Sequence, residues 1–398
     1  MGLFKHYPVP SDRMGALWTL LSIKGSCILE FGTSGTTRFT LNGFARMNGK
    51  ENSKIFSTHL YETDIALGKI DALEKALVNI IEKHNPSVVF IMPSTISSVI
   101  GTDIEAYCKI YQQKYAGTQI IYIRNDGFQG NWTVGIEDTL TVLVDKLAID
   151  GEKSGYPTFN IIGSCVDHYN YLSDAYEITR MMKEGFNAQP MAVLTSDTHI
   201  EDIKKMGRAH INLVLRREGI KSAKILEERF GMPYIVGKPY GLEGTLKWLS
   251  EISQVLNGMN EVFINQEKKV LLEALKVAKA YAERQSVIMN GHIDVVKGMH
   301  WFIKDEIGCN VTYIWHNAPN IKDEDIPYYE ESQWESILLE KNYNVVMSNA
   351  LVLDLAKDNC KKIQIDIPNY KFDPIQYPYT PYVGLRGALN LLKLLINP

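Results

Sequence analysis

Runs of apolar residues alternate with helix-patterned segments along almost the whole chain. Most runs are near-continuous and rich in β-branched residues, as expected for strands buried on both faces of a parallel sheet. They fall into three groups of four. The first group covers residues 27–32, 54–60, 87–94 and 119–126, the second covers 158–164, 190–196, 211–216 and 233–239, and the third covers 286–291, 310–317, 343–349 and 361–368.

Amphipathic helices are predicted between these runs. Residues 68–84 repeat apolar side chains at a spacing of three and four, which is typical of a helix with one buried face. Thr198 and Glu201 have the spacing of a capping box and predict the start of another helix. The longest helical pattern, 264–285, lies between the second and third strand groups, and we interpret it as a connection between domains.

The alternation of strands and helices predicts an α/β fold with right-handed parallel crossovers. Three groups of four strands predict three Rossmann-like domains, each a roughly four-stranded parallel sheet flanked by helices. The length of 398 residues suits two or three domains. We expect the domains to cover residues 1–155, 156–285 and 286–398. Ligands of such sheets bind beyond the carboxyl ends of the strands, so the loops there are the candidate sites.

The first of these loops, GTSGTT, contains Gly32 and Gly35 directly after an apolar strand. It matches neither the P-loop pattern nor the GxGxxG dinucleotide fingerprint. Two interpretations stay open from the residues alone. The glycines let a helix start approach an anion, or they form a plain tight turn.

Two loops of the second domain hold candidate chemistry. GSCVDHYN places Cys165 and His168 after a strand, and a cysteine near a histidine is a candidate nucleophile, although the spacing does not make the two side chains face each other. RREG places Arg216 and Arg217 at a strand end, where they either bind a carboxylate or phosphate or form an ordinary solvated pair. We interpret His292, in GHIDVVKGMH, as an ordinary helix residue.

Composition excludes several classes of protein. The formal net charge is −4, from 42 basic and 46 acidic residues, which predicts no nucleic-acid or membrane-surface partner. No apolar segment has the length of a membrane span or signal sequence, so a cytoplasmic location is expected. The five cysteines are scattered without a CxxC pair, which favours free thiols over disulfides or a zinc site.

Read in order, several segments resemble the nitrogenase component 1 superfamily. We match the family's opening segment, with its glycine pair enclosing a cysteine, to SDRMGALWTLLSIKGSCILEFGTSGTTRF. Its TTCxxxxIGDDI turn and TPGFxGSxxxGY loop are similar to PSTISSVIGTDIEAYCK and NDGFQGNWTVGIEDTL. Later segments are similar to AHINLVLRREGIKSAKILEERFGMPYIVGKPYGLEGT and YPYTPYVGLRGALNLLKLL. The resemblance runs nearly end to end and implies the family's three-domain α/β fold.

The chain departs from the family at the cluster ligands. The resemblance places the three cluster cysteines at Ser11, Thr36 and Thr95, and the cofactor cysteine at about Arg216. Neutral hydroxyls do not replace thiolates as iron ligands. Cys27 is the one remaining candidate, from a shifted position. We therefore expect no metal and no cofactor bound by this chain alone.

The resemblance implies a subunit that works only within a complex. The partner is a homologous subunit or a second copy, in a dimer or heterotetramer, with an iron–sulfur cluster held at the interface by the partner's ligands. An ATP-dependent reductase with a 4Fe–4S cluster delivers low-potential electrons, which reduce a small molecule or tetrapyrrole. The alternative is a non-redox scaffold or pseudo-enzyme of the same fold that binds and transfers a cofactor, cluster or tetrapyrrole.

Two candidate sites follow from the resemblance, although no catalytic residue is assigned. The vestigial cluster pocket consists of Ser11, Gly32, Gly35, Thr36 and Thr95. The substrate cleft consists of Cys165, His168, Arg216 and Arg217.

Overall fold

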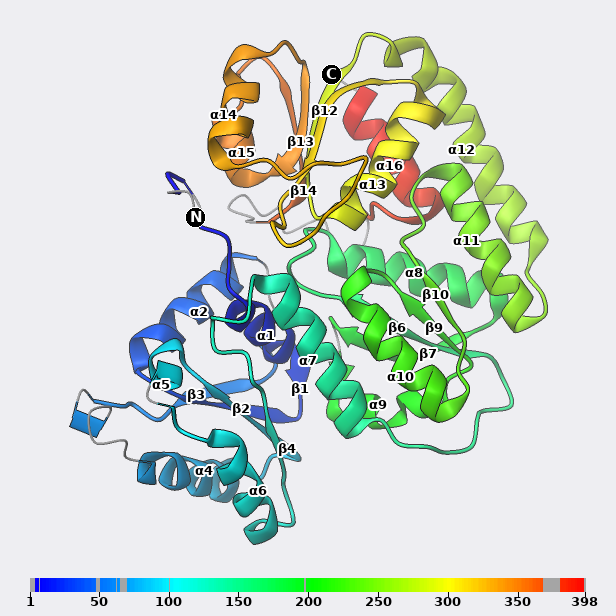
Figure 1. Cartoon of the computed structure of the whole chain (residues 1–398). Coiled ribbons are helices and arrows are strands. Elements are labelled where there is room, and N and C mark those ends of the chain that lie inside the picture. Colours follow the sequence, from blue (N-terminus) through cyan, green and yellow to red (C-terminus); the bar gives the residue numbers. More distant parts are fainter. Residues whose placement is uncertain are drawn as a thin grey trace.

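The computed structural model describes residues 4–6, 8–47, 51–61, 63–64, 70–99, 101–196, 198–367 and 380–396. This part of the chain contains three four-stranded sheets, and every pairing within them is parallel. The predicted α/β fold is therefore confirmed. The third sheet lies at the top of Figure 1, the first at lower left and the second at lower right. The domain limits near residues 155 and 286 stay a prediction.

The first sheet has the spatial order β3-β2-β4-β5. Its strands are β2 (Ser26–Phe31), β3 (Lys54–Ser57), β4 (Val88–Pro93) and β5 (Gln119–Tyr122). The helices of this region are α1 (Asp12–Leu21), α2 (Ser34–Arg46), α4 (Asp71–His84), α5 (Thr95–Val99), α6 (Ile104–Lys114) and α7 (Trp132–Leu147). Helix α4 confirms most of the helix predicted over 68–84, whose first two residues lie outside the described residues.

The second sheet has the order β10-β9-β6-β7. Its strands are β6 (Thr158–Ser164), β7 (Gln189–Thr195), β9 (Ile211–Val214) and β10 (Tyr234–Val236). Its helices are α8 (Tyr171–Phe186), α9 (Ile200–Lys205), η1 (Met206–Arg208), η2 (Arg217–Gly219), α10 (Ile220–Phe230) and α11 (Gly241–Leu256). The capping box predicted at Thr198 and Glu201 is wrong by one residue, because His199 caps α9 and Asp202 completes the box.

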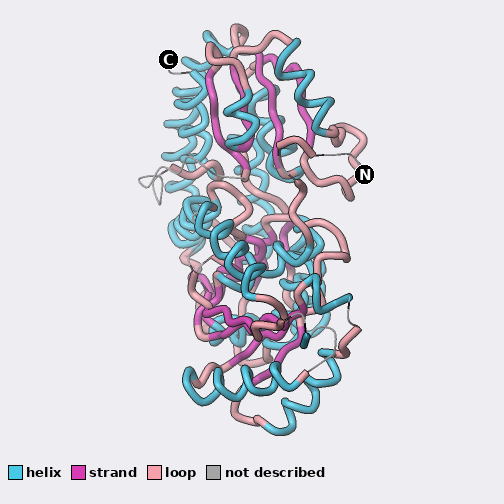
Figure 2. Tube along the Cα trace, turned by 90° about the vertical axis from the view of Figure 1, so that its left-hand side faces the viewer, coloured by secondary structure: helices cyan, strands magenta, loops and turns pink. Residues whose placement is uncertain are grey.

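The third sheet has the order β12-β11-β13-β14. Its strands are β11 (Ser286–Gly291), β12 (Asn310–His316), β13 (Val345–Asn349) and β14 (Lys361–Asp366). The remaining helices are α12 (Glu261–Ala282), α13 (Ile293–Trp301), the π-helical turn η3 (Phe302–Ile307), α14 (Glu331–Glu340), α15 (Ala350–Leu355) and α16 (Gly384–Ile396). Helix α12 confirms most of the helix predicted over 264–285, and its role as a connection between domains stays a prediction. The turned view of Figure 2 again separates this sheet, at the top, from the rest.

The hydrophobic cores are shared between the sheets. One core contains Ile28 and Phe90 of the first sheet together with Ile162 of the second. A second core joins the other face of the second sheet, including Ile161, to Met289 of the third. Successive residues of a strand thus enter different cores, which explains why the sequence runs are apolar without alternation.

Helices α1 and α7 cross with their backbones in contact. A Cβ atom on Gly15 would lie 2.0 Å from the carbonyl oxygen of Trp132, and one on Gly135 would lie 1.8 Å from that of Asp12. Only glycine permits this approach. The crossing fixes the start of α7 against the start of α1 and so positions Trp132, which lies where the sheets meet.

A separate two-stranded sheet joins the segment before β2 to the segment after β7. Strand β1 (Ile23–Lys24) pairs in parallel with β8 (Thr198–His199). Within the described ranges, every helix is too short or too polar to span a lipid bilayer.

Candidate functional site

The carboxyl ends of the second and third sheets meet around Arg216, which lies two residues after the end of β9 and is fully buried. Its Nη1 donates to Asp167 Oδ1 at 2.6 Å, and its Nε donates to Glu218 Oε2 at 2.6 Å. A Cβ atom on Gly163 would lie 2.6 Å from Arg216 Cγ, so the glycine makes room for the side chain. The positive charge is therefore paired within the chain by two carboxylates.

This pairing controls the ionisation of the buried groups. Burial opposes the charged form of Glu218, but the Arg216 guanidinium and His292 outweigh it and hold the pKa of that carboxyl well below its ordinary value. Burial also opposes the charge of Arg216, and Asp167 and Glu218 outweigh it and raise its pKa further. Both partners are therefore ionised at neutral pH.

Two histidines lie beside the ion pair. His292 caps α13, and its Nε2 lies 3.2 Å from Glu218 Oε1 and 3.4 Å from Arg216 Nη2. The ring of His168 lies 4.8 Å from that of His292, centroid to centroid. Burial, and then the nearby Lys238, Arg216 and His292, lower the pKa of His168, so its ring is neutral. The interpretation of His292 as an ordinary helix residue is therefore wrong.

Arg217 points to a different carboxylate. Its Nε and Nη2 lie 3.0 and 2.9 Å from Asp294 Oδ1, and its backbone N–H donates to Asp294 Oδ2 at 2.8 Å. An acidic ligand at the two arginines must therefore compete with carboxylates of the chain itself. Their role in substrate binding stays a prediction.

One group of side chains here has the composition of a metal site. Ligand atoms of Glu218, His292 and Asp294 lie within 4.8 Å of one another. However, Arg216 contacts the first two, and Arg217 contacts the third. Two fixed positive charges against the same ligand atoms oppose a cation. We assign no metal to this group.

The cysteines named from the sequence are buried thiols. Burial raises the pKa of Cys165 to about 11, and Thr195 Oγ1 donates to its sulfur at 3.5 Å. Cys27 lies in β2 within the apolar core between the first sheet and its outer helices, and burial raises its pKa as well. A thiol, unlike a thiolate, is neither a strong nucleophile nor an iron ligand.

The vestigial cluster pocket lies at the carboxyl edge of the first sheet, where the structure brings together Ser11 and Thr95. A Cβ atom on Gly127 would lie 2.7 Å from Thr95 Oγ1 and 3.8 Å from Ser11 Oγ. Thr95 Oγ1 donates to the carbonyl oxygen of Asp126 at 2.8 Å. At the same edge, a Cβ atom on Gly32 would lie 2.5 Å from Ser94.

Thr36 and Gly35 take other positions. Thr36 is half-buried, and its Oγ1 donates to the carbonyl oxygen of Thr33 at 2.9 Å, within the first turn of α2. Gly35 is exposed and has no atom within 4 Å of an added Cβ. The next residue, Thr37, is buried instead, and its Oγ1 donates to Glu30 Oε2 at 2.5 Å.

A buried ion pair completes this corner. Arg13 Nη2 donates to Glu30 Oε1, and the two side chains are 7% and 0% exposed. Sequence reasoning missed both residues, although a glutamate inside the apolar run CILEFG was the available signal. The side chains at this corner are hydroxyls and an ion pair, and they do not fit a thiolate-ligated iron–sulfur cluster.

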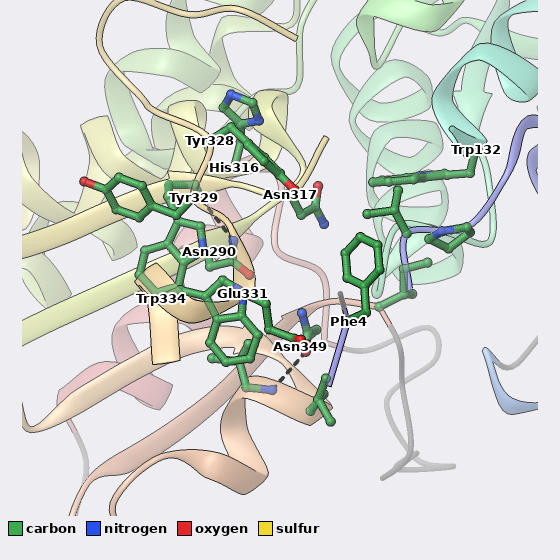
Figure 3. A pocket seen from close by; sticks show the side chains of 16 residues that line it. Phe4, Trp132, Asn290, His316, Asn317, Tyr328, Tyr329, Glu331, Trp334 and Asn349 are labelled. Atoms are coloured by element: carbon green, nitrogen blue, oxygen red, sulfur yellow. Dashed lines mark hydrogen bonds between the residues drawn. The ribbon is translucent and has the colours of Figure 1, made fainter. Parts of the chain in front are cut away.

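A pocket of about 90 Å³ lies between the carboxyl edge of the third sheet and the N-terminal segment. Figure 3 shows Trp132 and Phe4 on one side and Tyr329 and Trp334 on the other. Sequence reasoning missed this pocket. The signal was a repeated one, because three strand runs of the third group end in or beside an asparagine. These asparagines, Asn290, Asn317 and Asn349, line the pocket.

Comparison with known families decides the ancestry. Residues 11–398 match the family described as nitrogenase component 1 type oxidoreductase. The chain belongs to this family. The nitrogenase component 1 fold also appears in the chain titled nitrogenase Cp1 at pH 6.5, which superposes with a TM-score of 0.85 at 18% identity over 100% of this chain and 93% of that one.

Relatives within the nitrogenase component 1 family carry cofactor-biosynthesis names. The iron-molybdenum cofactor biosynthesis protein NifE of Clostridium pasteurianum is 31% identical over 265 residues, which are 65% of this chain and 56% of that protein. The corresponding protein NifN of Bradyrhizobium diazoefficiens is 20% identical over 423 residues, 97% of this chain and 87% of that one. The chain spans about half the length of the first three such relatives, 42% to 56%.

Proposed function

We propose that this chain is one subunit of a nitrogenase-like oxidoreductase complex. A second subunit, either homologous or another copy, supplies the ligands of any iron–sulfur cluster at the interface. An ATP-dependent reductase with a 4Fe–4S cluster supplies low-potential electrons, and the complex reduces a small molecule or tetrapyrrole. Family membership supports the complex, and the hydroxyl donors of this chain support the transfer of cluster ligation to the partner.

The apolar surface around the vestigial cluster pocket carries this proposal. Phe39 on α2, Val99 on α5 and Phe128 after β5 are 73%, 77% and 62% exposed. Their segments meet at one edge of the first sheet, because Thr95 at the start of α5 contacts Asp126 and Gly32 packs on Ser94. Large apolar side chains exposed on neighbouring segments favour a protein partner over solvent.

The test is anaerobic co-purification of this chain with a homologous subunit, followed by iron analysis and EPR. We expect iron in the complex and none in the isolated chain. Stoichiometric iron on the isolated chain contradicts the assignment of cluster ligands to the partner. Absence of a complex with a homologous subunit or with itself contradicts the subunit role.

The second candidate is a non-redox scaffold that binds and transfers a cofactor, cluster or tetrapyrrole. The names of the relatives NifE and NifN favour it. A turnover assay separates the two candidates. Substrate consumption that requires the ATP-dependent reductase supports the oxidoreductase, whereas transfer of a bound cofactor to an acceptor without net reduction supports the scaffold.

A further inference from the structure

We propose that the pocket between the third sheet and the N-terminal segment binds a small organic ammonium ion. The site belongs to this chain alone, so the proposal does not depend on a partner subunit or on electron transfer. Its volume of about 90 Å³ exceeds what a single water molecule needs. That size suits a methylated ammonium ion such as trimethylammonium.

Six aromatic side chains contribute to the pocket wall. They come from the N-terminal segment, the start of α7, strand β12, the loop after it and α14, and they are Phe4, Trp132, Trp315, Tyr328, Tyr329 and Trp334. Trp132 is held in place because its Nε1 donates to Asp167 Oδ2 at 3.0 Å. The rings of Trp315 and Tyr329 lie 5.9 Å apart. Aromatic faces arranged around one space attract cations through the ring quadrupole.

The charges at the pocket also favour a cation. Glu331 lines it, and its carboxylate accepts a hydrogen bond from the backbone N–H of Lys5 and another, at 3.0 Å, from that of His6. None of the described residues that line the pocket is a lysine or an arginine. The nearby ammonium of Lys5 is directed to Glu335, at 2.6 Å. An anionic ligand would find no positive side chain among the described residues of the wall.

Two polar atoms of residues that line the pocket have no hydrogen-bond partner within the described ranges. His316 is 1% exposed, and its Nδ1 has no hydrogen-bond partner within the described ranges. Asn317 Nδ2 donates to Asp366, which leaves Asn317 Oδ1 as an acceptor that is likewise without a partner among the described residues. Burial lowers the pKa of His316, so its ring is neutral and one nitrogen accepts hydrogen bonds. The neutral imidazole of His316 and the amide of Asn317 add no positive charge to the wall, which suits a cationic ligand.

Three probes separate charge from shape and from hydrogen bonding. Trimethylammonium carries a charge and one N–H, tetramethylammonium carries a charge and no N–H, and tert-butanol is neutral with one O–H. We expect trimethylammonium to bind the isolated full chain with a Kd on the order of 0.1–10 mM, within reach of so few atoms. We expect tert-butanol to bind at least about tenfold more weakly. Ligand-observed NMR at constant ionic strength measures the affinities of these probes.

Variants locate the binding. Trp334→Leu removes an aromatic face and Glu331→Gln removes the carboxylate, and each should weaken trimethylammonium binding about tenfold. Trp301→Leu is the matched control, because Trp301 is 54% exposed on α13 and lies outside the pocket. Circular dichroism checks that the variants fold. Equal or tighter binding of tert-butanol, no binding of trimethylammonium, or unchanged affinity in both folded wall variants would overturn the proposal.

Discussion

Arg216 is held between Asp167 and Glu218 without access to solvent, and this makes it a residue on which folding depends. Replacement by methionine keeps the volume but leaves two carboxylates buried without a counter-charge. We expect Arg216→Met to lower the free energy of unfolding by about 3–5 kcal/mol, as for other buried pairs broken on one side. Urea unfolding followed by circular dichroism measures the loss.

Arg217→Met is the matched control. The side chain of Arg217 is 36% exposed, and that of its partner Asp294 is 23% exposed. Exposed ion pairs contribute little, so we expect a loss below about 1 kcal/mol. Equal losses in the two variants would contradict the structural importance of the Arg216 pair.

The buried carboxyl of Asp366 makes the stability of the folded chain depend on pH. Burial raises the pKa of its carboxyl to about 7, from 3.8. Because the folded pKa lies above the unfolded one, the stability contribution of this group is most favourable below pH 4 and falls as the pH rises to about 7. We expect Asp366→Asn to raise the free energy of unfolding by roughly 2–4 kcal/mol at pH 8 and by little at pH 4.

The asparagine variant keeps an oxygen that accepts from Asn317, so the substitution changes charge and little else. Urea unfolding of both proteins at pH 4, 6 and 8 measures how the free energy of unfolding changes with pH in each. A destabilised variant at pH 8 would show that the carboxylate itself is required.

The structure brings Ser11 and Thr95 to the same glycine, Gly127, and the assignment of the two residues to a former cluster pocket stays a prediction from the family resemblance. Sequence reasoning did not reveal that Thr37, and not Thr36, contacts Glu30, since the phase of a helix is fixed by tertiary packing. Of the two carboxylates that contact Arg216, Glu218 lies two residues away in the same loop, whereas Asp167 comes from a loop 49 residues away, and no local pattern predicts that second contact.

At the scale of single elements, two glycines of the GTSGTT loop have different reasons to be glycine. A Cβ atom on Gly32 would lie 2.5 Å from Ser94, whereas one on Gly35 meets nothing within 4 Å. We expect Gly32→Ala to destabilise the chain by about 1–3 kcal/mol through overpacking. We expect Gly35→Ala, inside α2, to be neutral or to stabilise it by up to about 1 kcal/mol.

Thermal unfolding of both variants measures the contrast. A Gly32→Ala variant of unchanged stability would mean that the β2 and β4 ends separate easily.

The strands themselves were predictable from apolar runs bounded by polar loops. The crossing of α1 on α7 was not, because Gly15 and Gly135 read in sequence as ordinary helix-weakening residues.

At the scale of the whole molecule, the shared cores predict that the first predicted domain is not independent. Ile28 and Phe90 pack in the same core as Ile162, which lies beyond residue 155. We expect a fragment of residues 1–155 to expose its part of this shared core and to lack a cooperative unfolding transition. Calorimetry and dye binding test it, and a sharp two-state transition would contradict this expectation.

The exposed apolar surface at the vestigial cluster pocket predicts association. Phe39→Ser should weaken binding to a second copy or homologous subunit at least about tenfold, with a change in stability within about 0.5 kcal/mol. Val277→Ser is the control, since Val277 is 63% exposed on α12, far from this edge in sequence. Analytical ultracentrifugation measures both, and equal effects of the two substitutions would contradict an interface at Phe39.

The pairing of β1 with β8 has a consequence for synthesis of the chain. Ile23 pairs with Thr198, so the first partner leaves the ribosome about 175 residues before the second. At about 5–20 residues per second, that interval lasts roughly 10 to 35 s. During this time β1 lacks its partner strand, and the apolar residues beside it lack their native packing. The nascent chain is therefore a candidate for protection by chaperones that act during translation.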